Sequence, residues 1–308
     1  MEIMIRYVEH DNINKNKWDA AIDASSNGIV YSKSWYLDIV SPGWNALIDE
    51  DYKSVFPLTS RKKFGISYLY QPFFTQQLGL FSVEDIATGN VEKFLDAIPG
   101  SYKLVEIQLN HSNKISNLNE RNNSVTQRLT HHLNLGTPYE ALQKNYSENL
   151  KRNLKRAMQN DLTITNDFST EDLTALFRNN RGRGVETLKQ KDYLVFEKLI
   201  ETAHSKGLIN KSGIKIDGKL GAGAIFLRSN HEYIFLFSAT GERAKENGAM
   251  TFIIDNFIKL RAGEKKVLDF EGSMDPGLAR FYKSFGSDEV VYLQIRKNNL
   301  PLPFRWLK

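Results

Sequence analysis

Apolar residues recur at the spacing of a helix in several parts of the chain, and β-branched and aromatic runs separate these parts. The pattern predicts helices over residues 18–24, 34–40, 91–98, 170–177 and 193–203, and strands over residues 46–49, 54–61, 104–109, 125–135, 214–216 and 220–227, with a further apolar and aromatic stretch at residues 66–74. Asp217 and Gly218 provide a favourable hairpin turn between the last two strands. Pro72 excludes a regular central strand through its position. The chain is therefore expected to mix helices with strands.

The order of elements is similar in the two halves of the chain. A helix, a strand, a short helical or irregular stretch and a second strand run from residue 91 to 135, and the same order returns from Gly248 to a strand that starts at Val290. Gly136-Thr137-Pro138 follows the first series, and glycine and proline both end strands. We predict two α/β domains, comprising residues 1–137 and 138–308.

The most informative stretch follows a β-rich run at residues 233–238. A polar loop leads from this run to a helix that begins near Gly248. The backbone N–H groups and the dipole at a helix start make a site for anions, and phosphate is the common biological case. The alternative is that Gly248 only allows the helix start to pack close to the sheet. The predicted donor and phosphate-binding residues are Arg243, Lys245, Asn247, Gly248 and Ala249.

Two basic segments in the second half offer further contacts for anions. Ser147 caps a predicted helix with an apolar stripe of Leu150, Leu154 and Met158. The alternatives to a functional role are a solvated helix face and a plain surface loop. The residues predicted to bind phosphate or an acidic substrate are Lys151, Arg152 and Lys155 on the helix, and Arg181 and Arg183 in a glycine-containing loop.

Composition excludes several kinds of chemistry. The 308-residue chain has no cysteine, which excludes disulfides, thiolate metal ligands and a cysteine nucleophile. The six histidines form no HExxH motif, and His131 and His132 should point to opposite faces of a strand, so no metal site is predicted. The sequence also lacks the patterns of a P-loop, a dinucleotide-binding Rossmann fold and an α/β-hydrolase elbow.

The sequence shows no targeting or membrane segment. The N-terminal residues lack the continuous apolar run of a signal peptide, and no stretch approaches the roughly 20 apolar residues of a membrane span. We therefore expect a cytoplasmic protein without a membrane span. The formal net charge of +5 favours anionic partners without naming one.

Two motifs in the second half resemble a known family. The loop and helix around Gly248 resemble the donor-binding segment of the GNAT acyltransferase superfamily, whose Gln/Arg-x-x-Gly-x-Gly/Ala pattern would fall on Lys245, Gly248 and Met250. The runs DFEGS and ARFYKSFG are similar to the end of FemAB-like proteins, which are peptidoglycan-bridge aminoacyltransferases. The resemblance implies two tandem GNAT-like domains, each with a mixed, mostly antiparallel sheet flanked by helices. It also implies that Tyr282 protonates the leaving group, whereas the alternative for Tyr282 is a core aromatic residue.

Acyl transfer to an amine is the chemistry that remains, and it needs a held donor, a polarised carbonyl and a group that moves protons. Glu271, at the end of a predicted strand, is the candidate base or amine-binding carboxylate, and Ser273 on the next loop is a further candidate for substrate binding. The expected co-substrate is acyl-CoA or aminoacyl-tRNA, with no permanently bound cofactor. The expected acceptor is a small molecule or a cell-wall precursor.

Two other functions stay open. One is a catalytically silent GNAT-like protein that binds a nucleotide-linked ligand, and turnover would separate it from an enzyme. The other is a nucleic-acid-binding module that uses the basic helix and the arginine loop. A steep loss of nucleic-acid affinity with salt would support this module.

Overall fold

The chain divides into two compact units. The computed structural model describes residues 4–86, 89–116, 124–180, 188–272 and 274–300. The first unit comprises residues 1–129 and 290–308, and the second comprises residues 130–289. The predicted domains, 1–137 and 138–308, place residues 130–137 and the C-terminal strand differently, and the predicted boundary after Thr137 stays a prediction.

Backbone pairing explains these two assignments. Strand β8 (Ser124–Asn134) continues into the second unit, where its Leu133 pairs with Leu268. Strand β14 (Asp288–Asn298) returns to the first unit, where its Ile295 pairs with Ile107. Sequence order alone does not reveal this return, because the two paired strands are far apart along the chain.

The first unit contains an antiparallel sheet and a second group of strands. The sheet has the order β1 (Ile5–Val8), β2 (Asn45–Asp49), β3 (Ser54–Leu58) and β6 (Phe81–Ser82). The second group has the order β4 (Ser60–Lys63), β5 (Ile66–Leu69), β7 (Tyr102–Gln108) and β14. Within this group β5 and β7 run parallel, whereas the other neighbours run antiparallel.

Three α-helices of the first unit accompany these strands: α1 (Lys15–Ala24), α2 (Ser34–Val40) and α3 (Asn90–Asp96). Short 3₁₀ helices lie at His10–Asn12 and Val30–Ser32. Buried aromatic residues hold the helices to the strands. Trp18 of α1 contacts Trp44 with ring centroids 4.7 Å apart, and Phe94 of α3 stacks on Phe56.

The second unit is built on one twisted group of strands. Its order is β8, β13 (Val267–Asp269), β12 (Glu232–Thr240), β11 (Lys219–Arg228), β10 (Ile209–Ile216) and β9 (Ile164–Thr165). Only the β12–β13 pair among these neighbours is parallel in the part of the chain that the structure describes. The helices are α4 (Tyr139–Lys144), α5 (Glu148–Gln159), α6 (Thr170–Asn179), α7 (Gln190–Ser205), α8 (Glu242–Glu246), α9 (Ala249–Arg261) and α10 (Pro276–Lys283).

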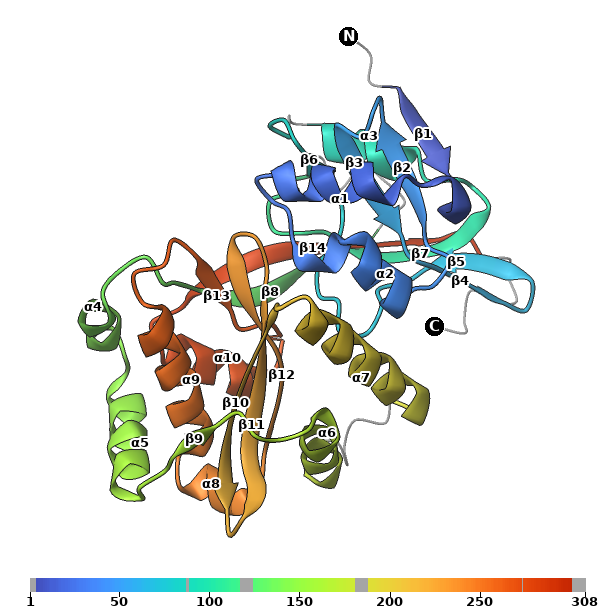
Figure 1. The fold of residues 1–308 in the computed structure, drawn as a ribbon. Coiled ribbons are helices and arrows are strands. Elements are labelled where there is room, and N and C mark those ends of the chain that lie inside the picture. The colour runs from blue at the N-terminus through green and yellow to red at the C-terminus, as the bar shows by residue number, and fades with distance from the viewer. Residues whose placement is uncertain (1–3, 87–88, 117–123, 181–187, 273, 301–308) are drawn as a thin grey trace. The chain divides into compact units, whose positions relative to one another are not determined.

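These helices cover both faces of the strands. Figure 1 shows α5, α9 and α10 on one side of β10–β12, and α6 and α7 on the other. On the first side, Phe257 of α9 stacks on Phe226 of β11 with centroids 3.8 Å apart. On the second side, Phe196 of α7 and Phe177 of α6 both contact Phe237 of β12. The expected mixed α/β architecture with mostly antiparallel strands is confirmed.

The structure confirms some of the expected local elements and corrects others. The turn at Asp217 and Gly218 is confirmed, since both residues have positive φ as a type I′ hairpin requires. In the apolar stretch at 66–74, strand β5 ends at Leu69, three residues before Pro72, as the expected exclusion of a strand through Pro72 requires. The prediction of a loop before Gly248 is wrong in part, because Glu242–Glu246 form the short helix α8, in which Ala244 is the buried residue.

No helix among the described residues has the length and apolar content that a bilayer crossing requires.

Candidate functional site

A cleft of about 980 Å³ opens on the second unit where two parallel strands separate. Strand β12 pairs with β13 only from Glu232 to Ile234 and then continues alone on that side to Thr240. The end of β12, the starts of α9 and α10 and the end of α6 line the cleft. Backbone groups and helix ends therefore meet at one accessible place.

The start of α9 is held close to α5 by a glycine. Gly248 is the N-cap residue of α9 and has a φ of +74°. A Cβ added to Gly248 would lie 2.9 Å from the carbonyl oxygen of Asn153 in α5. Glycine thus meets both a left-handed conformation and a close approach. The alternative from the sequence placed this packing against the sheet, whereas the contact in the structure is with α5.

The same helix start lies at the cleft. Gly248, Met250 and Thr251 line it, as does Asn153. The first N–H groups of a helix have no acceptor within the helix, and the positive end of the helix dipole lies there. This arrangement can accept an anionic group of a ligand.

The other predicted phosphate-binding residues occupy different places. The exposed Lys245 of α8 lines the cleft. Arg243 instead forms an ion pair with Asp217 in the β10–β11 turn. Asn247 is the C-cap residue of α8, and its side-chain oxygen accepts a 3.4 Å hydrogen bond from Asn160.

Ala249 is fully buried as the first residue of α9. It can therefore offer a ligand only its backbone. The structure brings Lys245 and Gly248 together at the cleft, and it places the Arg243 side chain on the neighbouring hairpin.

Tyr282 belongs to both the core and the cleft wall. Its side chain is 6% exposed and lines the cleft. The ring stacks on Phe270 with centroids 4.9 Å apart, and Phe235 and His131 each lie 6.2 Å from it. These contacts fix the orientation of the phenol ring, as a proton donor to a bound ligand would require.

Glu271 follows β13 directly and is a strained, partly buried acid. Its φ is +47°, a region that costs a residue with a side chain about 1–3 kcal/mol and that clusters at functional sites. Its Oε1 is buried and has no hydrogen-bond partner among the described residues. Burial raises the pKa of Glu271 to about 8. The carboxyl is therefore mostly protonated at neutral pH, although it is not among the residues that line the cleft.

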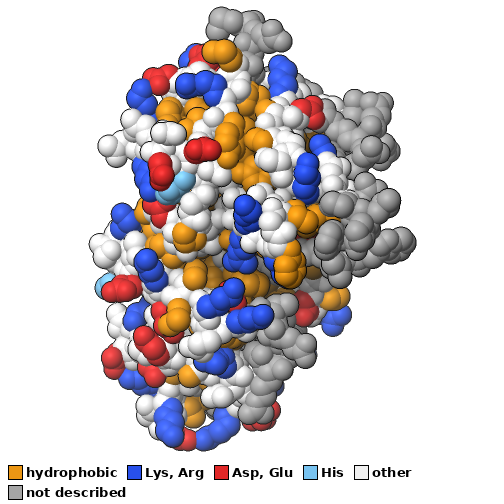
Figure 2. Space-filling model, turned by 90° about the vertical axis from the view of Figure 1, so that its right-hand side faces the viewer, with side chains coloured by type: hydrophobic (Ala, Val, Ile, Leu, Met, Phe, Trp, Pro, Cys, Tyr) orange, Lys and Arg blue, Asp and Glu red, His pale blue; other side chains and the backbone are white. Residues whose placement is uncertain are grey.

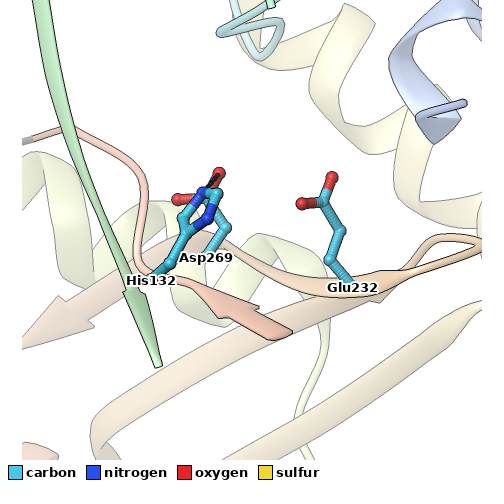
Figure 3. A group of neighbouring side chains, drawn as sticks. All are labelled: His132, Glu232 and Asp269. Atoms are coloured by element: carbon cyan, nitrogen blue, oxygen red, sulfur yellow. Dashed lines mark ion pairs between the residues drawn. The ribbon is translucent and has the colours of Figure 1, made fainter. Parts of the chain in front are cut away.

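His132, Glu232 and Asp269 form an acid–base cluster on neighbouring strands (Figure 3). Asp269 is 1% exposed, and its Oδ1 accepts hydrogen bonds from Thr130 Oγ1 at 2.5 Å and from the Glu271 N–H at 2.8 Å. Its Oδ2 lies 3.3 Å from His132 Nε2. One nitrogen or oxygen atom from each of the three side chains lies within 4.8 Å of the other two, close enough to share a proton or a cation.

The electrostatics of this cluster follow from burial and from its like charges. Burial, together with the charge of Asp269, raises the pKa of Glu232 to about 8. Burial alone would lower the pKa of His132, but the contact with Asp269 and the charge of Glu232 outweigh it, so this pKa is raised. The sequence gives no signal for this cluster, because its three residues are far apart along the chain or on different strands. The predicted placement of His131 and His132 on opposite faces is correct, because His131 lies against Tyr282 instead.

The predicted basic helix is α5. Its N-terminal cap is as expected, but its buried apolar stripe is shorter than expected. Ser147 Oγ accepts a 3.2 Å hydrogen bond from the Leu150 N–H, which confirms the cap. Leu150 and Leu154 are buried, but Met158 is 56% exposed, so the expected apolar stripe is one residue too long.

The cations of α5 lie at the surface. Lys151 forms a 2.9 Å ion pair with Glu148, Arg152 contacts Asn149 at 3.5 Å, and Lys155 is exposed. Figure 2 shows a different side of the molecule, the right-hand side of Figure 1, on which Lys and Arg side chains lie among hydrophobic ones. The remaining predicted substrate-binding residues, Arg181, Arg183 and Ser273, lie outside the described residues.

Comparisons with known proteins place the fold. No family model matches the chain, and no curated protein matches it by sequence. The crystal structure of FemX matches with a TM-score of 0.67 and 13% identity, covering all of both chains.

Two further structures match over nearly their whole lengths. L-PGS from Bacillus licheniformis has a TM-score of 0.54 and 14% identity, with 94% of this chain and 93% of that one covered. The C-terminal domain of a putative lysylphosphatidylglycerol synthetase from Agrobacterium fabrum has a TM-score of 0.51 and 11% identity, with 95% and 93% covered.

The chain shares the fold of these structures, and the match to FemX fits the expected arrangement of two tandem GNAT-like units. This shared fold agrees with the resemblance of the C-terminal motifs to FemAB-like proteins.

Proposed function

We propose that the chain transfers an aminoacyl or acyl group from a tRNA- or CoA-linked donor to an amine, and that the cleft at the start of α9 holds the donor. One observation carries the proposal: the cleft joins the N-terminus of α9, Lys245 and Tyr282 in a chain with a FemAB-like fold. FemX and a putative lysylphosphatidylglycerol synthetase share this fold, which supports aminoacyl or acyl transfer as the general reaction.

The reaction requires few groups. The amine nitrogen attacks the carbonyl carbon of the donor, and an amide bond forms while the bond to the thiol or ribose oxygen of the donor breaks. Tyr282 is the proposed source of the proton that the leaving sulfur or oxygen needs. Glu271 in its ionised form is the proposed acceptor of the proton that the amine loses, because a pKa of about 8 makes its carboxylate a stronger base than an exposed one. Free N–H groups near the cleft would polarise the carbonyl.

The charges at the cleft bear on the donor. Lys245 lies among the lining residues together with the acids Glu242 and Asp275. Backbone N–H groups of α9 therefore have to supply much of the attraction for a phosphate. A tRNA donor would need additional cations, and Lys151 and Lys155 on α5 are the proposed contacts, because α5 also contributes Asn153 to the cleft. The proposed acceptor is a small-molecule amine or a cell-wall precursor.

A thermal-shift series with the full chain tests the donor. CoA, acetyl-CoA, longer acyl-CoAs, charged tRNA and uncharged tRNA are compared, since a ligand that binds only the folded state raises the melting temperature. The donor that binds should then support formation of an amide with added amines. Lys245→Ala should weaken binding, whereas Lys265→Ala, an exposed cation elsewhere in the unit, should not.

The two donor classes give different patterns. Binding of tRNA should fall steeply with salt and should weaken in the double variant Lys151→Ala/Lys155→Ala. Binding of acyl-CoA should be insensitive to that variant. A shift without turnover would support the catalytically silent binder, and no shift with any donor would contradict the proposal.

A further inference from the structure

The hairpin of β4 and β5 in the first unit ends in an unusual turn. Lys63 pairs with Ile66, so Phe64 and Gly65 form a two-residue loop, and their φ angles are +51° and +78°. Positive φ at both positions defines a type I′ turn, for which asparagine, aspartate and glycine are favoured. Phenylalanine at the first position therefore strains the turn that it forms.

Burial within the chain does not compensate this strain. The Phe64 side chain is 83% exposed, and the Lys63 ammonium group lies 5.4 Å from its ring centroid. Phenylalanine is among the side chains that gain most from leaving water. A strained and exposed aromatic residue at a hairpin tip is thus better explained by a partner than by the stability of the hairpin itself.

Three cations directly precede Phe64 in the sequence. Arg61, Lys62 and Lys63 are consecutive and exposed, and none of them forms an ion pair with another residue in the described part of the chain. The Arg61 guanidinium lies over the ring of Tyr70 at 4.0 Å. Neighbouring charges of one sign repel one another, and an anionic partner relieves that repulsion.

We propose that this tip docks on an anionic phospholipid surface, with Phe64 entering the headgroup region and the three cations meeting lipid phosphates. Side chains alternate along a strand, so Arg61 and Lys63 lie on one face of β4 and Lys62 on the other. The cations therefore lie on both faces of the strand that leads to the tip. At an anionic membrane, an exposed aromatic ring can enter the headgroup region while neighbouring cations stay at the phosphates. Figure 1 shows the hairpin at the right-hand margin of the first unit.

A structural role accounts for only part of this arrangement. Strand β4 is at the edge of its group of strands, and lysines on an edge strand discourage pairing with another chain. That role explains cations on β4, but it does not explain an exposed phenylalanine in a left-handed conformation. Docking through the tip does not depend on the proposed transfer reaction, so each can fail without the other.

Vesicle co-sedimentation of the full chain tests the proposal. Wild type should bind vesicles of phosphatidylcholine with phosphatidylglycerol and should bind pure phosphatidylcholine vesicles weakly. Phe64→Asn places a residue suited to the turn at this position, so its melting temperature should equal or exceed that of wild type. Its vesicle affinity should nevertheless fall about tenfold or more. Leu260→Asn, which changes a 68% exposed side chain on α9, is the matched control and should bind as wild type does.

The cations are tested in the same assay. Lys62→Ser/Lys63→Ser should weaken vesicle binding about fivefold per cation at low salt, and less as salt rises. Lys17→Ser/Lys53→Ser removes the same charge from two lysines that already pair with acids, and it should have little effect.

Three results would overturn the proposal. The first is no preference of wild type for anionic vesicles. The second is unchanged vesicle binding in both tip variants. The third is tRNA binding that the tip variants abolish, in the absence of any vesicle binding, which would assign the tip to nucleic acid.

Discussion

Replacing Gly248 by alanine tests how the start of α9 is held at the cleft. Gly248 has a φ of +74°, and an added Cβ would lie 2.9 Å from the Asn153 carbonyl oxygen. A residue with a side chain in the left-handed region costs about 1 kcal/mol relative to glycine. Because α9 and α5 must move apart to relieve the contact, a further cost of about 1–2 kcal/mol is expected. The total loss of unfolding free energy should be about 2–3 kcal/mol.

Gly263 after the end of α9 provides the matched control. Its φ is +87°, but nothing lies within 4 Å of an added Cβ. Gly263→Ala should therefore show the conformational cost of about 1 kcal/mol without the steric one. Urea titration of both variants measures the difference, and the donor-induced shift in melting temperature should shrink in Gly248→Ala alone. Equal losses of unfolding free energy in the two variants would refute the argument from the α5 contact.

Three further changes have defined outcomes. Tyr282→Phe keeps the stacked ring but removes the hydroxyl, so steady-state assays should show turnover about 10²–10⁴-fold lower. The unfolding free energy should change by less than about 1 kcal/mol. Full activity in this variant would show that Tyr282 does not take part in the reaction. Burial raises the pKa of Glu271 from 4.5 to about 8, so the folded state binds this proton more tightly than the unfolded chain, and stability falls as pH rises from about 4.5 through about 8. The unfolding free energy of Glu271→Gln should fall by about 2–3 kcal/mol less than that of wild type between pH 5 and 9, after discounting for the partial exposure of Glu271. Parallel curves of stability against pH for the variant and wild type would contradict this. Tyr139 and Tyr146 both donate hydrogen bonds to the buried Asp255. Asp255→Ala should therefore lower the unfolding free energy by about 3 kcal/mol in urea titration, and Asp255→Asn should lower it less. Equal losses in the two variants would contradict the role of these hydrogen bonds.

Local chemistry made several parts of the fold predictable. Asp217-Gly218 specifies a turn through its own backbone preferences, and Ser147 specifies a helix start through one hydrogen bond. The alternation of side chains along a strand was enough to separate His131 from His132. Each of these features depends on residues that are neighbours in sequence.

Other features depend on partners far away in the chain and could not be predicted in this way. The polar run that contains Arg243 forms a helix because Ala244 is covered in the second unit, and the Arg243 side chain turns to Asp217. The acid–base cluster needs His132, Glu232 and Asp269 from three strands whose register the sequence does not disclose. The return of β14 to the first unit has the same cause.

The positions of the predicted donor and catalytic residues could be anticipated from the sequence, but their roles could not. Gly248 and Lys245 were selected from a loop-and-helix pattern, and both line the cleft. Tyr282 was selected from a resemblance, and it also lines the cleft. Their roles in binding and transfer stay predictions, because position at a cleft does not establish chemistry.

The most direct test of the central claim is a transfer assay in which the full chain is incubated with a labelled acyl or aminoacyl donor and a panel of amines. Mass spectrometry would detect the amide product, with Tyr282→Phe as the comparison. The account predicts an amide that forms only with the wild-type protein and one donor class, and that falls at least about 100-fold in the variant. An absence of transfer from every CoA- and tRNA-linked donor, together with no donor-induced rise in melting temperature, would contradict it.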